Sequence, residues 1–201
     1  MNILEYLNGP HVKDGHEYKS PYMAALIDAR NSTGRDLVTG EIVNADLTGN
    51  WPGAISYLIL IDHIGYFFCR KDINVQGKNS FVSALQGFTD LNEKEIFALY
   101  ALRCAFAHKY SLIHIGKGSK ADLLHHHFTV RGGKYAPLMY LPEITWDGKI
   151  ENRTRDNITT ISLEAVGNLV EGIHKKLISF AESNNLEFLN KDELIYITYP
   201  L

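Results

Sequence analysis

Residues 91–110, LNEKEIFALYALRCAFAHKY, carry the clearest helix signal in the chain. Asn92 is a favourable N-cap residue, and Glu95 stands three positions later, where its side chain completes a capping box. Beyond this start, only Tyr100 and Arg103 interrupt a run of apolar residues that continues to position 107. A helix that is apolar around its circumference is buried on more than one side. The sequence therefore predicts a helix that other elements cover on both faces.

Comparable start signals and apolar spacing predict the other helices. Ser20 and Pro21 are typical of an N-cap and a first helical position, and Asn79 and Ser162 can cap two further helices. The segment that begins at Trp51 is apolar around nearly its whole circumference, which indicates a central helix. The apolar residues after Ser162 step by three and four, as in a bundle seam. The predicted helices span residues 21–30, 51–70, 80–90, 93–110 and 163–184, with a short one near 192–198.

Between positions 111 and 161 the apolar residues alternate with polar ones, which is typical of half-buried strands. Glycine-containing stretches at 116–119, 131–134 and 146–149 supply turns between the alternating segments. We therefore predict a small antiparallel sheet between the last two long helices. Its strands fall within residues 111–115, 124–130, 138–141 and 158–161.

Together these elements predict a mainly α fold, an antiparallel bundle of four to five helices with a small antiparallel β insertion at about 111–161. Residues 1–50 are interpreted as an N-terminal extension, with an irregular start and one short helix, that packs on the bundle. Residues 51–184 are expected to form the bundle with its insertion, and residues 185–201 a C-terminal tail with a short helix. Most of the apolar pattern thus concerns stability rather than function.

The composition is that of an ordinary globular chain. Of its 201 residues 45% are hydrophobic, and the formal net charge of −3 excludes a polycation that attracts nucleic acid over its whole surface. Cys69 and Cys104 are too few for a disulfide framework and lie in apolar runs, as expected for buried thiols in a reducing compartment. The N-terminus lacks the features of a signal peptide, and Asp62 and His63 interrupt the most apolar stretch. We expect a soluble cytoplasmic protein with no membrane association.

Positive charge is concentrated in one part of the chain. From Arg103 to Lys134 there are six basic residues and one acid, a net charge of +5, which leaves −8 for the remainder. Five of the nine histidines also fall in this window, namely His108, His114, His125, His126 and His127. This pattern indicates a local cationic surface that becomes more positive as the pH falls.

Arg103 and His108 are the residues that point most clearly to chemistry. A guanidinium within a buried helix needs an ionic partner or a polyanion, because an uncompensated buried charge is strongly destabilising. The two residues are five positions apart, about 140° around a helix, so that both can border one cleft at its end without touching. In an alternative interpretation, Arg103 pairs with Asp62 on the central helix, and His108 only caps the helix C-terminus.

The segment Tyr100–His108, YALRCAFAH, resembles the signature of the HEPN superfamily, in which an arginine is followed after four to six residues by a histidine near a helix end. The resemblance covers roughly residues 50–184. It implies a helical bundle and metal-independent endoribonuclease activity, often that of toxins or abortive-infection defence effectors. It also implies that Arg103 and His108 are the active pair, usually completed by the same pair across a homodimer. Cys104 departs from active members, which usually have a polar residue at that position.

The implied reaction is cleavage of RNA through its own 2'-hydroxyl. His108 would accept the hydroxyl proton, a second histidine would protonate the leaving 5'-oxygen, and Arg103 would stabilise the charged phosphorane, which gives a 2',3'-cyclic phosphate. No metal or cofactor is required, and accessible single-stranded RNA is the expected substrate. A protein antitoxin is a further expected partner. The expected contacts to the RNA backbone are Lys109, Lys117, Lys120, Arg131 and Lys134.

Two other function classes stay open on the sequence. Some members of the superfamily have lost activity, so a non-catalytic module that binds RNA, a nucleotide or a protein partner is the main alternative. The other is a structural interaction protein, in which Arg103 is fixed to Asp62 and has no affinity for phosphate. Accessibility of His108 at a cleft separates the catalytic from the binding interpretation.

Three further patterns have ordinary structural explanations. His125 and His127 have the spacing of metal ligands, but no third ligand is identifiable, so we expect no metal. These two are predicted to lie on a solvated face of a strand, with His126 on the apolar face. Cys104 is interpreted as a small buried hydrophobe rather than a nucleophile. The segment 116–120, GKGSK, lacks the spacing of a phosphate-binding loop and is predicted to be a hairpin turn.

Overall fold

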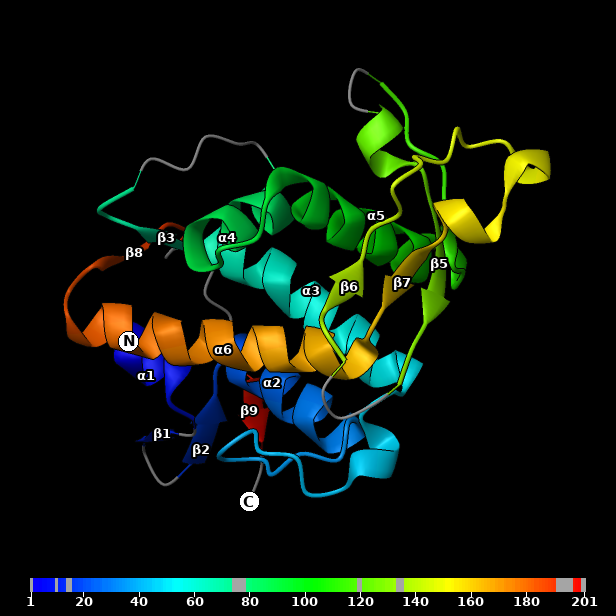
Figure 1. The fold of residues 1–201 in the computed structure, drawn as a ribbon. Coiled ribbons are helices and arrows are strands. Elements are labelled where there is room, and N and C mark those ends of the chain that lie inside the picture. The colour runs from blue at the N-terminus through cyan, green and yellow to red at the C-terminus, as the bar shows by residue number, and fades with distance from the viewer. Residues whose placement is uncertain are drawn as a thin grey trace.

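Six α-helices and a set of short strands make up the described part of the chain, so the fold is mixed α/β rather than purely helical (Figure 1). The structure is a computed structural model and describes residues 2–9, 11–13, 16–73, 79–118, 121–132, 136–190 and 197–199. The helices are α1 (Ile3–Leu7), α2 (Pro21–Ser32), α3 (Trp51–Phe67), α4 (Ser80–Phe88), α5 (Glu93–Lys109) and α6 (Leu163–Glu182).

The five longer helices begin where the sequence predicts. A polar side chain just before each of them accepts a hydrogen bond from a backbone N–H of the first turn. These caps are Ser20, Asn50, Asn79, Asn92 and Ser162. At α5 the capping box is complete, because Glu95 also accepts from the backbone N–H of Asn92 at 2.9 Å. The helix starts therefore follow from local hydrogen bonding.

α3 is the central helix, as predicted. It packs against α2, α4, α5 and α6, and Figure 1 shows it behind α6 with the other helices around it. Leu58, Ile61 and Ile64 of α3 are buried, and Leu99 and Leu102 of α5 are fully buried beside them. Within the described part of the chain, no helix combines the length and the apolar character that a membrane crossing requires.

The β insertion follows α5 and forms a four-stranded sheet in the order β4–β5–β7–β6. Its strands are β4 (Ile113–His114), β5 (His126–Val130), β6 (Met139–Tyr140) and β7 (Thr159–Ile161). The prediction of a purely antiparallel sheet is wrong in one place, because β5 and β7 are parallel. The chain between these two strands includes β6 and a long excursion, and it is long enough for the crossover that parallel neighbours require. In Figure 1 the sheet lies at one end of the helices, beside α5.

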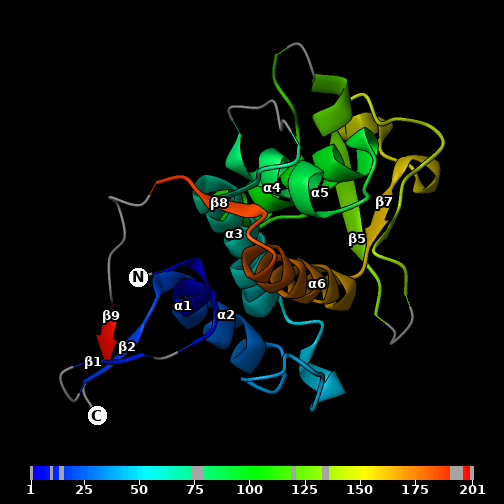
Figure 2. The ribbon, with the colours of Figure 1, turned by 90° about the vertical axis from the view of Figure 1, so that its left-hand side faces the viewer.

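The first fifty residues are an integral part of the fold. The start that was predicted to be irregular contains α1, whose Tyr6 and Leu7 are buried, and the strands β1 (His11–Lys13) and β2 (His16–Lys19). β2 pairs with β9 (Ile197–Tyr199), so segments from the two ends of the chain meet in one sheet. Figure 2 shows this sheet at the opposite end of the molecule from β5 and β7.

The C-terminal tail is extended where the structure describes it. β8 (Leu186–Phe188) pairs with β3 (Phe68–Arg70), and this pairing explains why α3 stops before the predicted end at residue 70. The helix predicted near 192–198 is wrong at Ile197 and Thr198, whose backbones pair with β2 in β9. The remainder of that predicted helix lies outside the described residues.

Buried polar side chains tie the N-terminal part to α3 and α6. Arg30 donates from Nε and Nη2 to the two carboxylate oxygens of Glu171, at 2.9 and 2.8 Å. Tyr57 donates to the same carboxylate at 2.8 Å, and Arg30 Nη1 donates to the carbonyls of Leu37 and Val38. Buried charges are tolerated when they are paired and hydrogen-bonded in this way. This network fixes the loop after α2 against α6.

Candidate functional site

α5 carries the candidate site, and α3 supplies its acidic member. Arg103 Nε donates a 2.7 Å hydrogen bond to Asp62 Oδ2, and 25% and 24% of the two side chains stay exposed. The ionic partner expected in the alternative interpretation of the sequence is therefore present. This bond uses one of the five N–H donors of the guanidinium. Asp62 thus orients Arg103 without enclosing it.

Arg103 also reaches His108. Its Nη1 lies 3.4 Å from His108 Nε2, at the long end of the hydrogen-bond range, although the two positions are five residues apart. A guanidinium only donates, so Nε2 is the acceptor, and the proton of the neutral imidazole is on Nδ1. His108 is exposed in the last turn of α5. The two side chains that the sequence places at one cleft are thus in direct contact at an accessible surface.

The electrostatics of the pair keep Arg103 charged. Burial lowers its pKa, but the hydrogen bond to Asp62 and the negative charge of that carboxylate more than compensate, so the pKa lies above its usual value. A charged planar group that is partly exposed suits phosphate oxygens, which can accept two parallel N–H bonds from it. The arrangement can therefore bind and polarise a phosphodiester next to an imidazole.

An aromatic cluster closes the end of α5. Trp51 stacks on Phe106 with ring centroids 4.5 Å apart, and its centroid lies 5.3 Å from that of Tyr110. Tyr110 is the C-cap residue and has a left-handed backbone, φ 48°, which ends the helix and turns the chain toward β4. It is 62% exposed and stands two residues after His108, where it offers a stacking surface for a base. Cys104 is buried, as predicted.

The structure brings only some of the predicted RNA contacts to this end of α5. Lys109 is exposed in the last turn of the helix. Arg131 is exposed just after β5, and its guanidinium lies over the Tyr140 ring of β6, 6.0 Å from the centroid, so it points toward the opposite edge of the sheet from β4. Lys117 is also exposed, but it lies past the other end of β4. Lys120 and Lys134 lie outside the described residues.

Residues 141–158 fold over one face of the sheet, so the predicted solvated face for His125 and His127 is wrong. Trp146 lies edge-on to both rings, with centroid distances of 6.5 and 5.2 Å. His127 is 7% exposed, its Nε2 lies 2.6 Å from Asn157 Oδ1, and His125 accepts from the Gly116 N–H. Across the ranges that the structure describes, no three histidine, cysteine or carboxylate side chains are grouped so as to hold a metal ion. The histidine run therefore has a structural role.

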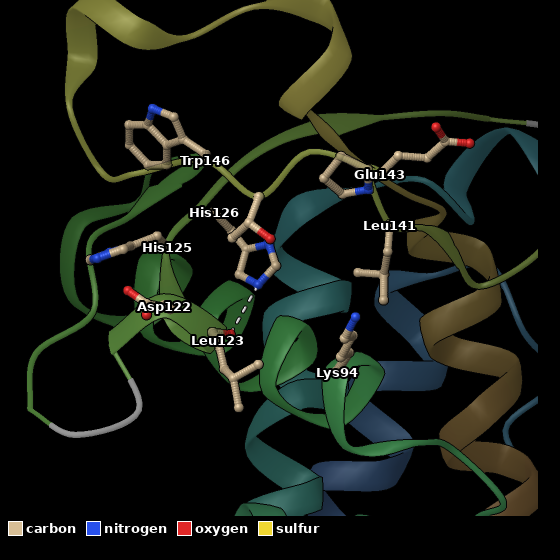
Figure 3. A pocket seen from close by; sticks show the side chains of 10 residues that line it. Lys94, Asp122, Leu123, His125, His126, Leu141, Glu143 and Trp146 are labelled. Carbon is tan, nitrogen blue, oxygen red and sulfur yellow. Dashed lines mark hydrogen bonds between the residues drawn. The ribbon is translucent and has the colours of Figure 1, made fainter.

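A small cavity of about 80 Å³ lies between the N-terminal end of α5 and the sheet (Figure 3). Lys94 points into it from α5, toward His126 and Leu141. The His126 ring is fixed, because its Nε2 donates to the Leu123 carbonyl at 3.2 Å, and burial lowers its pKa to about 4. Lys94 precedes His108 by fourteen residues, roughly 21 Å along a helix axis. This cavity is therefore separate from the candidate pair.

An open groove on the insertion carries two arginines that the sequence pattern did not single out. It has a volume of about 380 Å³, and its lining includes His127, Arg153 and Arg155. Both arginines are exposed, and Arg153 Nε donates to the Ile150 carbonyl at 3.2 Å. Residues 147–156 contain three acidic and three basic side chains. Their net charge is therefore zero, and it did not indicate a cationic surface in this segment.

Comparison with protein-family models, with curated proteins and with solved structures finds no match to this chain. The chemistry of the residues themselves is therefore the basis for assigning a function. That chemistry is an arginine held by a carboxylate, in contact with an accessible histidine at a helix end.

Proposed function

We propose that this protein is a metal-independent endoribonuclease of the HEPN type, with Arg103 and His108 as its catalytic pair. The observation that carries the proposal is the 3.4 Å contact between Arg103 Nη1 and His108 Nε2, with Asp62 bound to Nε of the same guanidinium. An arginine that only stabilised the helices would be expected in an enclosed pair, as Arg30 is with Glu171. The location of the motif near the C-terminus of a bundle helix also supports the family assignment.

The geometry supports a phosphoryl-transfer step that uses the RNA 2'-hydroxyl as the nucleophile. Arg103 binds the non-bridging oxygens of the scissile phosphate and stabilises the charge that builds up on them. His108 accepts the proton of the 2'-hydroxyl as the 2'-oxygen forms its bond to phosphorus. The bond from phosphorus to the 5'-oxygen breaks, and this oxygen receives a proton from an acid. The products are a 2',3'-cyclic phosphate and a 5'-hydroxyl.

Charge and aromatic surface near the pair support RNA as the substrate. Lys109 is exposed in the last turn of α5 and can neutralise a neighbouring phosphate, and Arg131 is a second exposed cation, on the sheet. Tyr110 and Trp51 offer ring faces to unpaired bases. The open groove on the insertion offers two further exposed arginines, Arg153 and Arg155, as contacts to phosphate. These features favour single-stranded RNA, whose bases and backbone are both accessible.

A homodimer is the proposed assembly. Ile59 and Tyr66 of α3 are 50% and 41% exposed, and they flank Asp62 at helical spacing on one face. Exposed apolar side chains next to a polar site are typical of a protein–protein contact. A second copy packed on this face of α3 would bring two Arg103–His108 pairs close together, as the resemblance to HEPN proteins implies.

The deciding experiment is cleavage of a mixed-sequence RNA in EDTA by the wild type, Arg103→Ala and His108→Ala. We expect cleavage by the wild type only, because the arginine stabilises the transition state and the histidine accepts the proton. Loss of one such group slows catalysis by about 10²–10⁴-fold. The product ends are checked for the 2',3'-cyclic phosphate, which only 2'-hydroxyl attack produces.

Each other outcome has a definite meaning. Cleavage that survives in both variants would assign the activity to another site or to a contaminating nuclease. RNA binding without cleavage by the wild type, weakened by Arg103→Ala, would support the non-catalytic binding module instead. Binding that is unchanged in Arg103→Ala would remove Arg103 from every version of the site.

A further inference from the structure

His114 differs from the other six histidines whose side chains the structure describes. Each of those six has a hydrogen-bond partner: Tyr6 for His63, Arg103 for His108, Gly116 for His125, Leu123 and Thr159 for His126, Asn157 for His127, and Tyr22 for His174. His114 is partly buried, yet among the described residues neither ring nitrogen has a hydrogen-bond partner. Its ring nitrogens are not fully shielded, because in the described part of the chain the buried side-chain nitrogen or oxygen without a partner is Nε of Arg35. Both nitrogens of His114 are therefore open to a substrate.

The strand β4 brings His114 back toward the candidate pair. β4 begins four residues after α5 ends and packs against that helix. In the antiparallel register His114 is opposite His126, so the two side chains lie on the same face of the sheet. His126 stacks on Phe128, which belongs to the hydrophobic core, so this is the face that packs on the helices. The His114 imidazole therefore lies on the face of the sheet that packs on α5.

The groups that shift the pKa of His114 show which charged side chains lie near it. Burial lowers the pKa of His114, and Lys109, together with His125 and His108 when these are protonated, lowers it further. Lys109 and His108 belong to α5, and His125 stands just before β5, so charged groups face His114 from both elements packed against it. His114 is thus an imidazole within electrostatic reach of His108, and among the described residues its ring nitrogens have no hydrogen-bond partner. These are the properties that a second acid–base group requires.

We propose that His114 is the general acid of the ribonuclease site and acts in the same chain as Arg103 and His108. The inference rests on the proposed function and deepens it. His108 takes the proton of the 2'-hydroxyl, the bond between the 2'-oxygen and phosphorus forms, and the bond between phosphorus and the 5'-oxygen breaks. His114 gives its proton to the departing 5'-oxygen. One proton is taken up and one is released, and no electron or co-reactant is needed.

The two imidazoles are suited to opposite roles. Neutral His108 directs its acceptor nitrogen at Arg103, and an RNA phosphate that takes the guanidinium donors frees this nitrogen to accept a proton. The positive groups around His114 make its imidazolium a stronger acid. A phosphate bound at Arg103 brings the negative charge that keeps His114 protonated until the leaving oxygen needs the proton. The acid and the base then lie within a single chain.

The test uses an RNA with one cleavable linkage, made either with the normal 5'-oxygen or with a bridging 5'-sulfur at that linkage. A thiol, with a pKa of about 8.5, is far more acidic than an alcohol, so a thiolate leaves without a proton donor. We expect His114→Ala to cleave the oxygen RNA about 10²–10⁴-fold more slowly than the wild type. The same variant is expected to cleave the sulfur RNA close to the wild-type rate, whereas His108→Ala is slow on both.

The dependence of the rate on pH gives a second readout. The wild-type rate on the oxygen RNA is expected to fall as rising pH deprotonates the acid, and this fall is expected to be absent on the sulfur RNA. His125→Gln is the matched control, because it removes a neighbouring imidazole that already has a structural partner. It is expected to cleave both RNAs like the wild type.

The outcomes separate this inference from the proposed function. If the wild type cleaves neither RNA, both fail together. If the wild type cleaves and His108→Ala does not, but His114→Ala cleaves the oxygen RNA normally, only the role of His114 is overturned. His114→Gln repeats the test with a side chain of similar size, and slow cleavage of both RNAs by both His114 variants would also overturn it.

Discussion

The hydroxyl of Tyr6 on α1 lies 2.8 Å from Nε2 of His63 on α3, and the two rings stack at a centroid distance of 6.1 Å. This contact joins the first helix of the chain to its central helix. His63 is also the neighbour in sequence of Asp62, which faces α5 and holds Arg103. Adjacent positions of α3 thus serve different parts of the fold, because successive side chains of a helix point about 100° apart.

The stability of the protein is expected to fall as the pH drops from about 6.5 toward 5. Burial lowers the pKa of His63 from its ordinary value of 6.5 to about 4, and it has the same effect on His126 and His174. In this window the unfolded chain binds protons on these rings that the folded chain does not, so each ring contributes a slope of up to about 1.4 kcal/mol per pH unit. The pKa of Glu171 is lowered, so that carboxylate stays ionised above pH 5.

His63→Gln tests this prediction in urea unfolding at pH 7 and pH 5. We expect the variant to lose part of the pH dependence, since one of the rings whose pKa is lowered in the fold no longer titrates. Tyr6→Phe is the control. It removes the hydroxyl, at a loss of about 1 kcal/mol, but keeps the titrating ring and so the full pH dependence. An unchanged slope in His63→Gln would show that this ring does not contribute.

Arg30→Met is expected to destabilise the fold by roughly 3–5 kcal/mol, because it leaves the Glu171 carboxylate buried without its ionic partner. Arg30 and Glu171 are 2% and 5% exposed. Glu41→Gln is the control, since Glu41 and Lys175 form an ion pair of 3.5 Å whose side chains are 73% and 64% exposed. Such an exposed pair contributes about 0–1 kcal/mol.

The double variant Arg30→Met/Glu171→Leu separates the lost pair from lost packing. We expect it to be less destabilised than Arg30→Met alone, because it removes the unpaired charge. Unfolding free energies from urea titrations give the comparison. A double variant that is as unstable as the sum of the two single variants would mean that the charges are not coupled.

Asp62→Asn is expected to lower RNA cleavage by about 10²-fold, because the guanidinium loses the charge that positions it. Stability should change by less than about 1 kcal/mol, since both side chains of the pair are partly exposed. Single-turnover cleavage and urea unfolding measure the two effects. Asp62→Glu keeps the charge and is expected to retain more activity than Asp62→Asn. Full activity in Asp62→Asn would show that other contacts position Arg103.

Lys109→Ala is expected to make RNA binding less dependent on salt, because Lys109 is exposed next to His108 in the last turn of α5. Each phosphate contact to single-stranded RNA contributes about −0.7 to the slope of log K against log salt concentration. Fluorescence anisotropy with a His108→Ala background measures binding without cleavage. Lys117→Ala, at the other end of β4, is expected to change the slope less. A larger effect from Lys117 would place the RNA along the opposite end of the hairpin.

Ile59→Asp is expected to convert the proposed dimer into monomers, because it puts a charge in the exposed apolar face of α3. Light scattering during gel filtration gives the mass. Ile144→Asp is the control, since Ile144 is 60% exposed but belongs to the insertion, away from α3. A wild type that is monomeric at every concentration would contradict the dimer. It would leave the role of His114 untouched, since that role needs only one chain.

The sequence by itself predicted the five longer helices and singled out the candidate pair. Helix starts at Ser20, Asn92 and Ser162 were predictable because a cap satisfies N–H groups within one turn of itself. The contact between Arg103 and Asp62 was predictable from the composition of the two helices. A guanidinium in an apolar helix requires an anion, and Asp62 is the acid within the most apolar helix.

Only the tertiary structure decided how distant segments meet. The path of residues 141–158 decides both the parallel pairing of β5 with β7 and the contact of Trp146 with His127. The alternation of apolar and polar residues along the strands cannot show this path. Arg30 and Glu171 are 141 positions apart, and no spacing rule links them. The packing of β4, and with it His114, against α5 follows from the left-handed turn at Tyr110 that ends this helix. Helix caps and apolar periodicity depend on residues that are close in the sequence. The long-range contacts depend instead on which surfaces the whole chain buries together.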